Sequence, residues 1–351
     1  MQSIEQFKEQ VLAAAAGKRA LRIRGGGTKD WYGQRLEGDI LDTRGYKGVV
    51  DYEPTELVIT ARCGTPLAQI EAVLAERNQM LAFEPPHFGS DATLGGAIAA
   101  GLSGPRRPHS GAVRDFILGA KLMDGKGDVL TFGGQVMKNV AGYDVSRLLA
   151  GSMGTLGLLL EVSVKVLPRA FAQTTLRFEM SEIDAIRKLN EWGGQPLPVS
   201  ASCWHGGVLA LRLSGAQAAV DAAVRSLGGE VMADCDSFWE DLREQRHVFF
   251  DGEAVLWRLS VPSTTGAIVL KGEQMIEWGG AQRWLRAQSD QETAHDIRRT
   301  VAAAGGHATL FRAGDRSVGV FQPLQPAVAK IHERLKAAFD PSHIFNPGRM
   351  Y

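Results

Sequence analysis

The sequence predicts an α+β fold divided into two domains. A chain of 351 residues, 44% of them hydrophobic, is long enough to bury more than one core. Up to about residue 170, short strands are separated by glycine-rich turns, whereas from about residue 171 alternating strands are interleaved with alanine-rich helical stretches. This change in the pattern of strands, turns and helices indicates a second domain of the α+β class.

The first 76 residues contain two predicted helices and three predicted strands. Apolar residues repeat at helical spacing after Ser3, and Gln6 stands where a capping box needs it, so residues 4–16 are expected to form the opening helix. Short apolar and alternating runs then predict strands. The predicted strands cover residues 21–24, 40–42 and 57–61, and the second helix covers residues 66–76.

The rest of the first domain is expected to contain a helix, a hairpin and a long strand. Residues 95–102 are small and apolar, which favours a tightly packed helix that opens at a glycine turn. Residues 116–123 and 129–132 flank an Asp-Gly dipeptide, which is typical of a hairpin turn. A further strand over residues 158–167 is expected to end at Pro168.

The second domain has the elements of a ferredoxin-like unit. Helical stretches at residues 182–192 and 216–227 lie between predicted strands, as a ferredoxin-like βαβ unit requires. The predicted domains are residues 1–170, residues 171–338 as a substrate or cap domain, and residues 339–351 as a segment that returns to the first domain.

Three glycine-rich turns lie in the first half of the chain, at residues 24–28, 93–96 and 151–157. Glycine has no Cβ, so backbone N–H groups can approach a phosphate closely, and concave runs of such donors hold anions. A single glycine turn is usually an ordinary loop. Three turns with Thr or Ser beside them point instead to a dinucleotide site.

Charge and cysteine usage exclude several classes of protein. The 39 basic residues balance the 39 acidic residues, which disfavours nucleic-acid binding. Cys63, Cys203 and Cys235 are scattered without CxxC spacing, which fits a reducing compartment and excludes an iron–sulfur cluster held by this chain alone. The N-terminal residues show no signal-peptide pattern, and no apolar run approaches the length of a membrane span. We therefore expect a cytoplasmic protein.

Two patterns around these turns resemble a known group of proteins. Residues 93–107 and residues 138–148 resemble the flavoprotein superfamily of the vanillyl-alcohol oxidase type, also called PCMH-type, and within it the family of FAD-binding glycolate oxidase subunits. Residues 339–348 are similar to the tail pattern of the superfamily, and the resemblance extends over essentially the whole chain. It implies a PCMH-type FAD-binding domain of two subdomains, followed by a smaller ferredoxin-like cap domain.

The resemblance also implies which residues hold FAD. The first turn would bind the pyrophosphate, the second would clasp the dinucleotide, and the third would form walls near adenine and ribose. The implied residues are Arg24, Gly25, Gly26, Gly27, Thr28, Lys29, Thr93, Leu94, Gly95, Gly96, Arg114, Asp115, Gly154, Thr155, Gly157 and Val162. For Arg114 and Asp115, an exposed ion pair at the end of a strand is an equally good interpretation.

The attachment of FAD is expected to be non-covalent. Superfamily members that tether FAD carry a His in the first glycine loop or a Cys in the second segment. Here Thr28 occupies the first place, and no Cys lies between residues 64 and 202.

By the same resemblance, the chain is an FAD-binding subunit of a complex that oxidises glycolate to glyoxylate and passes electrons from FAD to a partner. The expected partners are a sister flavoprotein subunit that binds the small 2-hydroxy acid and an iron–sulfur subunit, and any contact with the inner membrane would be made through partners. Two alternatives stay open: a stand-alone FAD-dependent 2-hydroxy acid or alcohol dehydrogenase, and a structural subunit that has lost FAD. The intact glycines argue against the second alternative.

The sequence says less about the substrate. Related dehydrogenases carry several histidines with acidic residues that bind a metal, whereas His307 stands alone in the comparable region, so we expect no metal site. Arg312 and Arg316 are the candidates for binding a substrate carboxylate. Residues 138–144 line the flavin face or form a helix-entry loop. No residue can be named as the catalytic base.

Overall fold

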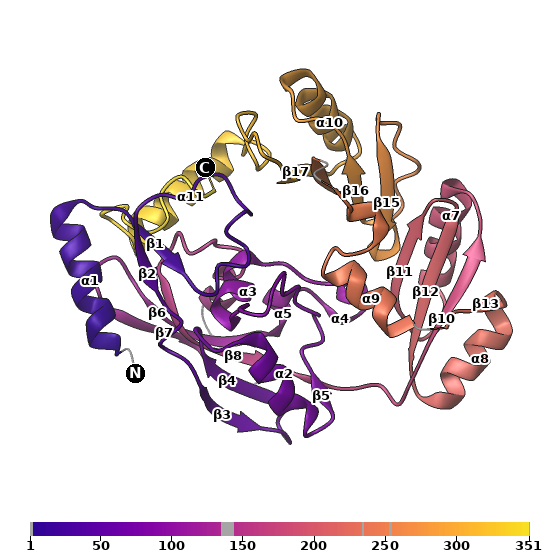
Figure 1. The fold of residues 1–351 in the computed structure, drawn as a ribbon, viewed down its shortest axis with the longest axis horizontal. Helices are drawn as coiled ribbons and strands as arrows, with labels where there is room; N and C mark the ends of the chain where they lie inside the picture. Colours follow the sequence, from indigo (N-terminus) through magenta and orange to yellow (C-terminus); the bar gives the residue numbers. More distant parts are fainter. Residues whose placement is uncertain (1–2, 135–143, 234, 253–254, 351) are drawn as a thin grey trace. The chain divides into compact units, whose positions relative to one another are not determined.

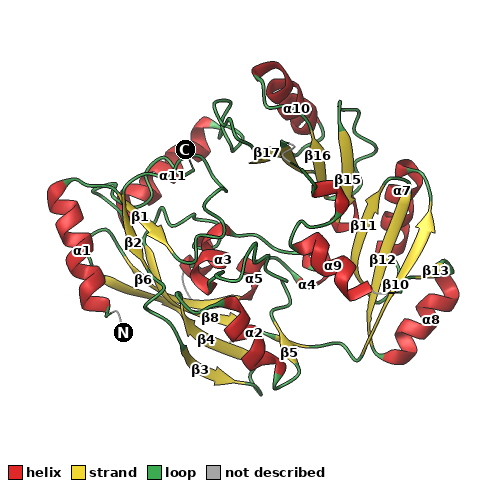
Figure 2. Ribbon diagram, viewed as in Figure 1, coloured by secondary structure: helices red, strands yellow, loops and turns green. Residues whose placement is uncertain are grey.

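The computed structural model describes residues 3–134, 144–233, 235–252 and 255–350. The chain forms two compact units. The first contains Met1–Ser103, Ala112–Pro168 and Pro323–Tyr351, and the second contains Gly104–Gly111 and Arg169–Gln322. Both units combine strands and helices, as the predicted α+β class requires (Figures 1 and 2).

A five-stranded sheet forms the centre of the first unit. Its strands lie in the order β3-β4-β8-β6-β7, and all neighbours are antiparallel. The strands are β3 (Val49–Glu53), β4 (Val58–Arg62), β6 (Ile117–Met123), β7 (Val129–Gly133) and β8 (Leu158–Lys165). The β6–β7 hairpin matches the predicted one.

Strand β8 supplies side chains to two separate cores. Leu158 and Leu160 pack in a core with helix α1 (Ile4–Gly17). Leu159 and Val162 pack in the larger core with helices α2 (Leu67–Ala75) and α3 (Leu94–Ala100). Along a regular strand, side chains alternate between the two faces, so Leu160 and Val162 would share one face. The register between β6 and β8 shifts near Leu160, and such a bulge moves the following residues to the other face.

Within its described residues, the first unit also contains five further helices and two small strand pairs. Helix α1 begins with the predicted capping box of Ser3 and Gln6. The parallel pair β1–β2 leads directly into the first glycine turn. The remaining elements are β1 (Leu21–Arg24), β2 (Asp39–Asp42), α2 (Leu67–Ala75), β5 (Gln79–Met80), α3 (Leu94–Ala100), α5 (Val113–Phe116), α6 (Val145–Leu148), β9 (Leu167–Pro168) and α11 (Pro326–Phe339).

The first half of the second unit has the predicted ferredoxin-like arrangement. Its elements follow one another as β-α-β-β-α-β, and its strands lie in the order β13-β10-β12-β11, all antiparallel. They are β10 (Ala172–Glu179), α7 (Glu182–Gly193), β11 (Val199–His205), β12 (Val208–Gly215), α8 (Gln217–Leu227) and β13 (Glu230–Val231).

The second half repeats this strand order, which no sequence repeat had indicated. Its strands lie in the order β15-β16-β14-β17, and the pairing of β11 with β15 joins the halves into one eight-stranded sheet. Residues 261–272 stand where the first half has a helix. The elements are β14 (Leu256–Ser260), β15 (Glu273–Glu277), β16 (Gln282–Arg286), α10 (Gln291–Ala303) and β17 (His307–Arg312); α4 (Arg107–Ser110), α9 (Cys235–Arg243), η1 (Val248–Phe250) and η2 (Trp278–Gly280) complete the unit.

The residue ranges of the two units differ from those of the predicted domains at residues 104–111 and near the C-terminus. Helix α11 belongs to the first unit because Leu335 and Phe339 pack against its core, so the chain returns at residue 323 rather than 339. Residues 104–111 belong to the second unit, where the guanidinium of Arg107 lies 4.4 Å from the ring centroid of Trp278.

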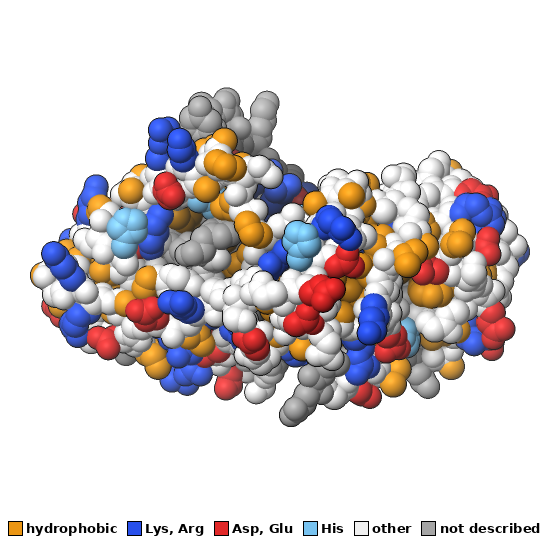
Figure 3. Space-filling model, turned by 90° about the horizontal axis from the view of Figure 1, so that it is seen from above, with side chains coloured by type: hydrophobic (Ala, Val, Ile, Leu, Met, Phe, Trp, Pro, Cys, Tyr) orange, Lys and Arg blue, Asp and Glu red, His pale blue; other side chains and the backbone are white. Residues whose placement is uncertain are grey.

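Acidic and basic side chains are interspersed on the face drawn in Figure 3, in keeping with the balanced composition. Among the described helices, none combines the length and the hydropathy that a membrane crossing requires.

Candidate functional site: a pocket walled by three glycine turns

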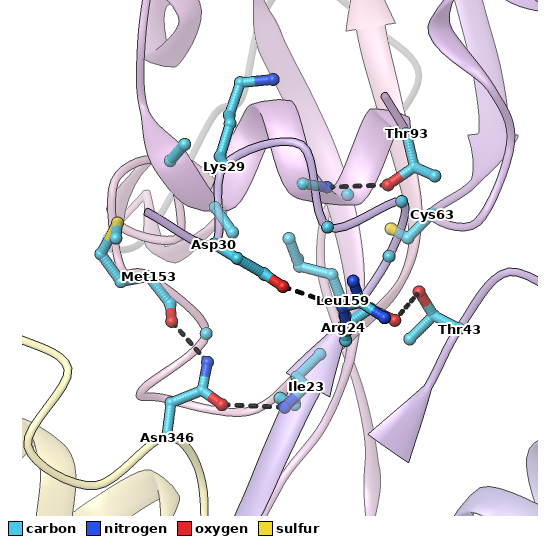
Figure 4. A pocket seen from close by; sticks show the side chains of 18 of the residues that line it. Ile23, Arg24, Lys29, Asp30, Thr43, Cys63, Thr93, Met153, Leu159 and Asn346 are labelled. Atoms are coloured by element: carbon cyan, nitrogen blue, oxygen red, sulfur yellow. Dashed lines mark hydrogen bonds and ion pairs between the residues drawn. The ribbon is translucent and has the colours of Figure 1, made fainter. Parts of the chain in front are cut away.

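A pocket in the first unit brings the three predicted glycine turns together (Figure 4). The predicted residues on its walls are Arg24, Gly25, Gly26, Gly27, Thr28, Lys29, Thr93, Gly95, Gly96, Gly154 and Gly157. Residues from strands β1 and β8, from helix α3, from the C-terminal tail and Cys63, which directly follows β4, also line the walls.

The first glycine turn offers a row of backbone donors. The backbone N–H groups of Gly25, Gly26, Gly27 and Thr28 donate to no acceptor in the part of the chain that the structure describes. The backbone at the start of the turn is fixed, because the amide of Thr43 donates to the carbonyl of Arg24 at 2.9 Å. The arrangement therefore leaves donors for a ligand while fixing the backbone that carries them.

The glycines of this turn are required by close backbone packing. A Cβ on Gly26 would come within 1.6 Å of the carbonyl oxygen of Asp91, and a Cβ on Gly25 within 2.3 Å of the hydroxyl oxygen of Thr93. Gly27 has φ = +73°, a conformation that side chains disfavour. The first turn is thus packed directly against the second.

Charged side chains beside the first turn are tied to one another. The Arg24 Nε lies 2.9 Å from the Asp30 carboxylate, which also pairs with Arg22. The ammonium of Lys29 donates to the carbonyl of His87 at 3.1 Å. The turn therefore carries positive charge whose position is fixed by neighbouring groups.

The second turn differs from the prediction in its use of backbone donors. Thr93 caps helix α3 by accepting from the amide of Gly96. The amides of Leu94 and Gly95 donate to the carbonyls of Thr65 and Cys63, at 2.9 and 2.8 Å. These two N–H groups serve the fold, so the second turn contributes shape and the Thr93 side chain to the pocket.

The third turn is joined to helix α3 and to the C-terminal tail. The amide of Met153 donates to the carbonyl of Ala99 at 2.9 Å. Gly154 has φ = +69°, and a Cβ there would lie 2.7 Å from the Nδ2 of Asn346. The glycine is needed both for the turn and for the approach of the tail.

Two wall residues come from the tail, to which sequence analysis had assigned no site role. The Oδ1 of Asn346 accepts from the amide of Ile23 at 2.8 Å, and its Nδ2 donates to the carbonyl of Met153 at 2.7 Å. The guanidinium of Arg349 donates to the carbonyls of Lys29 and Asp30, at 3.2 and 3.1 Å. The superfamily-like tail pattern over residues 339–348 was the sequence signal for Asn346, and Arg349 lies just beyond it.

Another tail contact holds the third turn from the side of α11. The ammonium of Lys336 donates to the carbonyls of Thr155 and Phe345 and pairs with Asp340 at 2.6 Å. Burial lowers the pKa of Lys336, an effect that the Asp340 carboxylate opposes.

Five predicted cofactor residues lie outside the pocket walls. Leu94 and Val162 are 1% exposed and pack in the core, and Thr155 donates its hydroxyl to the carbonyl of Ser152. Arg114 and Asp115 form an exposed pair with a nitrogen–oxygen distance of 3.8 Å. The Asp115 carboxylate also accepts from the amide of Ala112 at 2.9 Å, so it serves the local helix start.

The two predicted substrate arginines belong to the second unit. The guanidinium of Arg312 donates to the amide oxygen of Gln245 at 2.5 Å, and burial lowers its pKa. Burial also lowers the pKa of Arg316, whose Nε donates to the carbonyl of Ala313 at 3.5 Å. Their substrate role stays a prediction. Most of residues 138–144, predicted to line the flavin face or to form a helix-entry loop, lie outside the described residues.

The pocket fits a non-covalently bound dinucleotide. A pyrophosphate needs many N–H donors, and the first turn supplies them beside Arg24 and Lys29. No His is among the described residues that line the pocket, and burial raises the pKa of the Cys63 thiol, so its reactive thiolate is scarce. Among the described residues, no three His, Cys, Asp or Glu side chains converge on a metal site.

Comparison with known proteins extends these observations to the whole chain. Residues 1–133 match the FAD binding domain family. The chain is 51% identical over 343 residues to glycolate oxidase subunit GlcE of Escherichia coli (strain K12), covering 98% of this chain and 96% of that protein. It is 32% identical over 138 residues to glycolate oxidase subunit GlcD of Bacillus subtilis (strain 168), covering 39% of this chain and 29% of that protein.

A solved structure of alkyldihydroxyacetonephosphate synthase matches with a TM-score of 0.67 at 15% identity, covering 99% of this chain and 76% of that chain. This likeness confirms the predicted PCMH-type α+β fold. The family match of residues 1–133 confirms FAD as the cofactor. The nearly full-length identity shows that the chain belongs to the GlcE family of glycolate oxidase subunits.

Proposed function

We propose that this chain is the FAD-binding subunit of a glycolate oxidase complex, in which glycolate is oxidised to glyoxylate and electrons pass from FAD to a partner subunit. The observation that carries the proposal is the row of four backbone N–H groups in the first glycine turn, which have no acceptor among the described residues. The full-length similarity to GlcE supports the identity of the complex.

Each part of the pocket has a distinct task in holding the cofactor. Gly25, Gly26, Gly27 and Thr28 would donate to the pyrophosphate oxygens, and Arg24 would add positive charge. The third turn, around Gly154, would wall the adenosine end. The apolar wall residues Leu158 and Leu159 would exclude water from the bound cofactor.

When bound, FAD supplies a two-electron acceptor for the oxidation of a 2-hydroxy acid. We assign the substrate site to the sister flavoprotein subunit, since related hydroxy-acid sites carry several histidines with acidic residues and this chain has His307 alone in the comparable stretch. An iron–sulfur subunit would complete the electron route. In this arrangement the present chain binds FAD and passes electrons onward, and it does not bind the substrate.

Absorbance spectroscopy of the purified chain tests the proposal. We expect flavin bands that acid precipitation releases into the supernatant, because the attachment is non-covalent. Anaerobic glycolate should leave the bands unchanged in the isolated chain and bleach them once the partner subunits are added. Bleaching of the isolated chain by glycolate or by another hydroxy acid would identify a stand-alone dehydrogenase. A colourless protein that takes up no added FAD would identify a structural subunit.

A further inference from the structure

Asn346 occupies a junction where three separate segments of the first unit meet. Its backbone has φ = +40°, a left-handed conformation that Asn tolerates better than most residues. Its amide group joins the tail to the end of strand β1 through Ile23 and to the third glycine turn through Met153, at 2.8 and 2.7 Å. Figure 4 shows the side chain between these two segments, at the edge of the pocket.

The two bonds fix backbone that belongs to the pocket itself. Ile23 immediately precedes Arg24 and the first glycine turn, and Met153 immediately precedes Gly154 of the third turn. Both Ile23 and Met153 also line the pocket. One amide side chain therefore bonds directly to the backbone beside both glycine turns.

We infer that Asn346 is a positioning residue for FAD, whose amide holds the first and third glycine turns at the spacing that the dinucleotide requires. The inference rests on the proposed function. Asn is suited to the task because one side chain must accept from an N–H and donate to a carbonyl at the same time. Asp at this position would accept from Ile23 but would set a carboxylate oxygen against the carbonyl of Met153.

Other tail contacts keep the tail in place when the Asn346 amide is removed. Lys336 holds the carbonyls of Thr155 and Phe345, and Arg349 holds those of Lys29 and Asp30. A variant of Asn346 therefore loses the two bonds of the amide beside the glycine turns, while the bonds of Lys336 and Arg349 still attach the tail to the unit.

Two variants of the full chain test the inference. Asn346→Gly removes the amide and tolerates the positive φ. Asn346→Asp keeps the shape, and its acid form regains the donor that the carboxylate lacks. The matched control is Asn190→Asp in the second unit, because the Nδ2 of Asn190 likewise donates to two carbonyls, those of Ile186 and Ser263, both at 2.9 Å. The measurement is the Kd of FAD from fluorescence titration at pH 8 and pH 5, with apoprotein melting temperature recorded beside it.

We expect both Asn346 variants to raise the Kd of FAD about tenfold at pH 8. Facing the Met153 carbonyl should raise the pKa of the introduced carboxyl above its ordinary value of about 3.9. At pH 5 part of it then regains its proton, so the loss of affinity in Asn346→Asp should be smaller than at pH 8, while Asn346→Gly stays weak. The Kd of each variant is divided by the Kd of the wild type at the same pH, so that the contribution of neighbouring titratable and charged groups, which all the proteins share, is removed. These groups on the two sides of Asn346 are Arg24, Lys29, Asp30, His332, Glu333, Lys336, His343 and Arg349.

Equal FAD affinity in the wild type and both variants would overturn the inference. An equal loss in Asn190→Asp would also overturn it, since the effect would then be general destabilisation. A wild-type chain that binds no FAD would instead contradict the proposed function.

Discussion

The carbonyl oxygen of Asp91 lies so close to Gly26 that a Cβ on residue 26 would be 1.6 Å from it. Two stretches that are 65 positions apart in the chain thus pack backbone against backbone beside the candidate cofactor pocket. Side-chain substitution at Gly26 must therefore move the first glycine turn.

Gly26→Ala is expected to abolish retention of FAD through purification. The displaced turn no longer presents its row of N–H donors, although the core of the unit stays intact. The measurement is the ratio of flavin absorbance to protein absorbance, with circular dichroism to verify folding. Gly193→Ala is the matched control, because a Cβ at Gly193 meets nothing within 4 Å. Full flavin content in Gly26→Ala would show that the turn does not hold the cofactor.

Arg349→Lys is expected to raise the Kd of FAD about tenfold. The planar guanidinium of Arg349 reaches the carbonyls of Lys29, Asp30 and Arg35, at 3.2, 3.1 and 3.3 Å, and a lysine ammonium cannot reproduce that geometry. Fluorescence titration with FAD measures the change. Arg334→Lys on the exposed face of α11 is the control, and an equal effect in both variants would argue against a specific contact.

The stability of the second unit is expected to fall as the pH is lowered below about 6.5. Burial and the neighbouring His205 lower the pKa of His247, whose Nδ1 accepts from the amide of Phe249 at 3.2 Å. The unfolded chain then binds more protons than the folded chain, so the free energy of unfolding rises with pH through the window below the unfolded pKa.

His247→Asn should flatten this dependence, since an amide oxygen can accept from Phe249 without titrating. Urea unfolding of the two proteins at pH 7 and pH 5 measures the difference. His295→Asn on the exposed surface of α10 serves as the control. A pH dependence that His247→Asn leaves unchanged would assign the effect to other groups.

Cys235 is expected to be the one cysteine that iodoacetamide modifies in the folded protein. Cys63 and Cys203 are buried, and burial raises the pKa of both thiols, so the reactive thiolate is scarce. Mass spectrometry should find one adduct in the native chain and three in urea. Rapid native labelling of Cys63 would show that the wall of the cofactor pocket opens to the reagent.

Local pattern was sufficient to predict most elements of the first unit. The capping box of Ser3 and Gln6, the strand before Arg24 and the hairpin over β6 and β7 were all anticipated, since each depends on neighbouring residues alone. The eight-stranded sheet of the second unit was anticipated only in its first half. In the second half, residues 261–272 replace a helix, and the sequence carries no repeat that would reveal the shared strand order.

The same division applies to the cofactor site. The sequence by itself was sufficient to locate the three glycine turns that line the pocket, because the absence of a Cβ is a local property that permits close backbone approach. Only the tertiary structure decided that the amides of Leu94 and Gly95 donate to the carbonyls of Thr65 and Cys63 and so are not available to a ligand. It also decided that Asn346 lies against Ile23, 323 positions away, because partners at such separation are chosen by the packing of the whole unit.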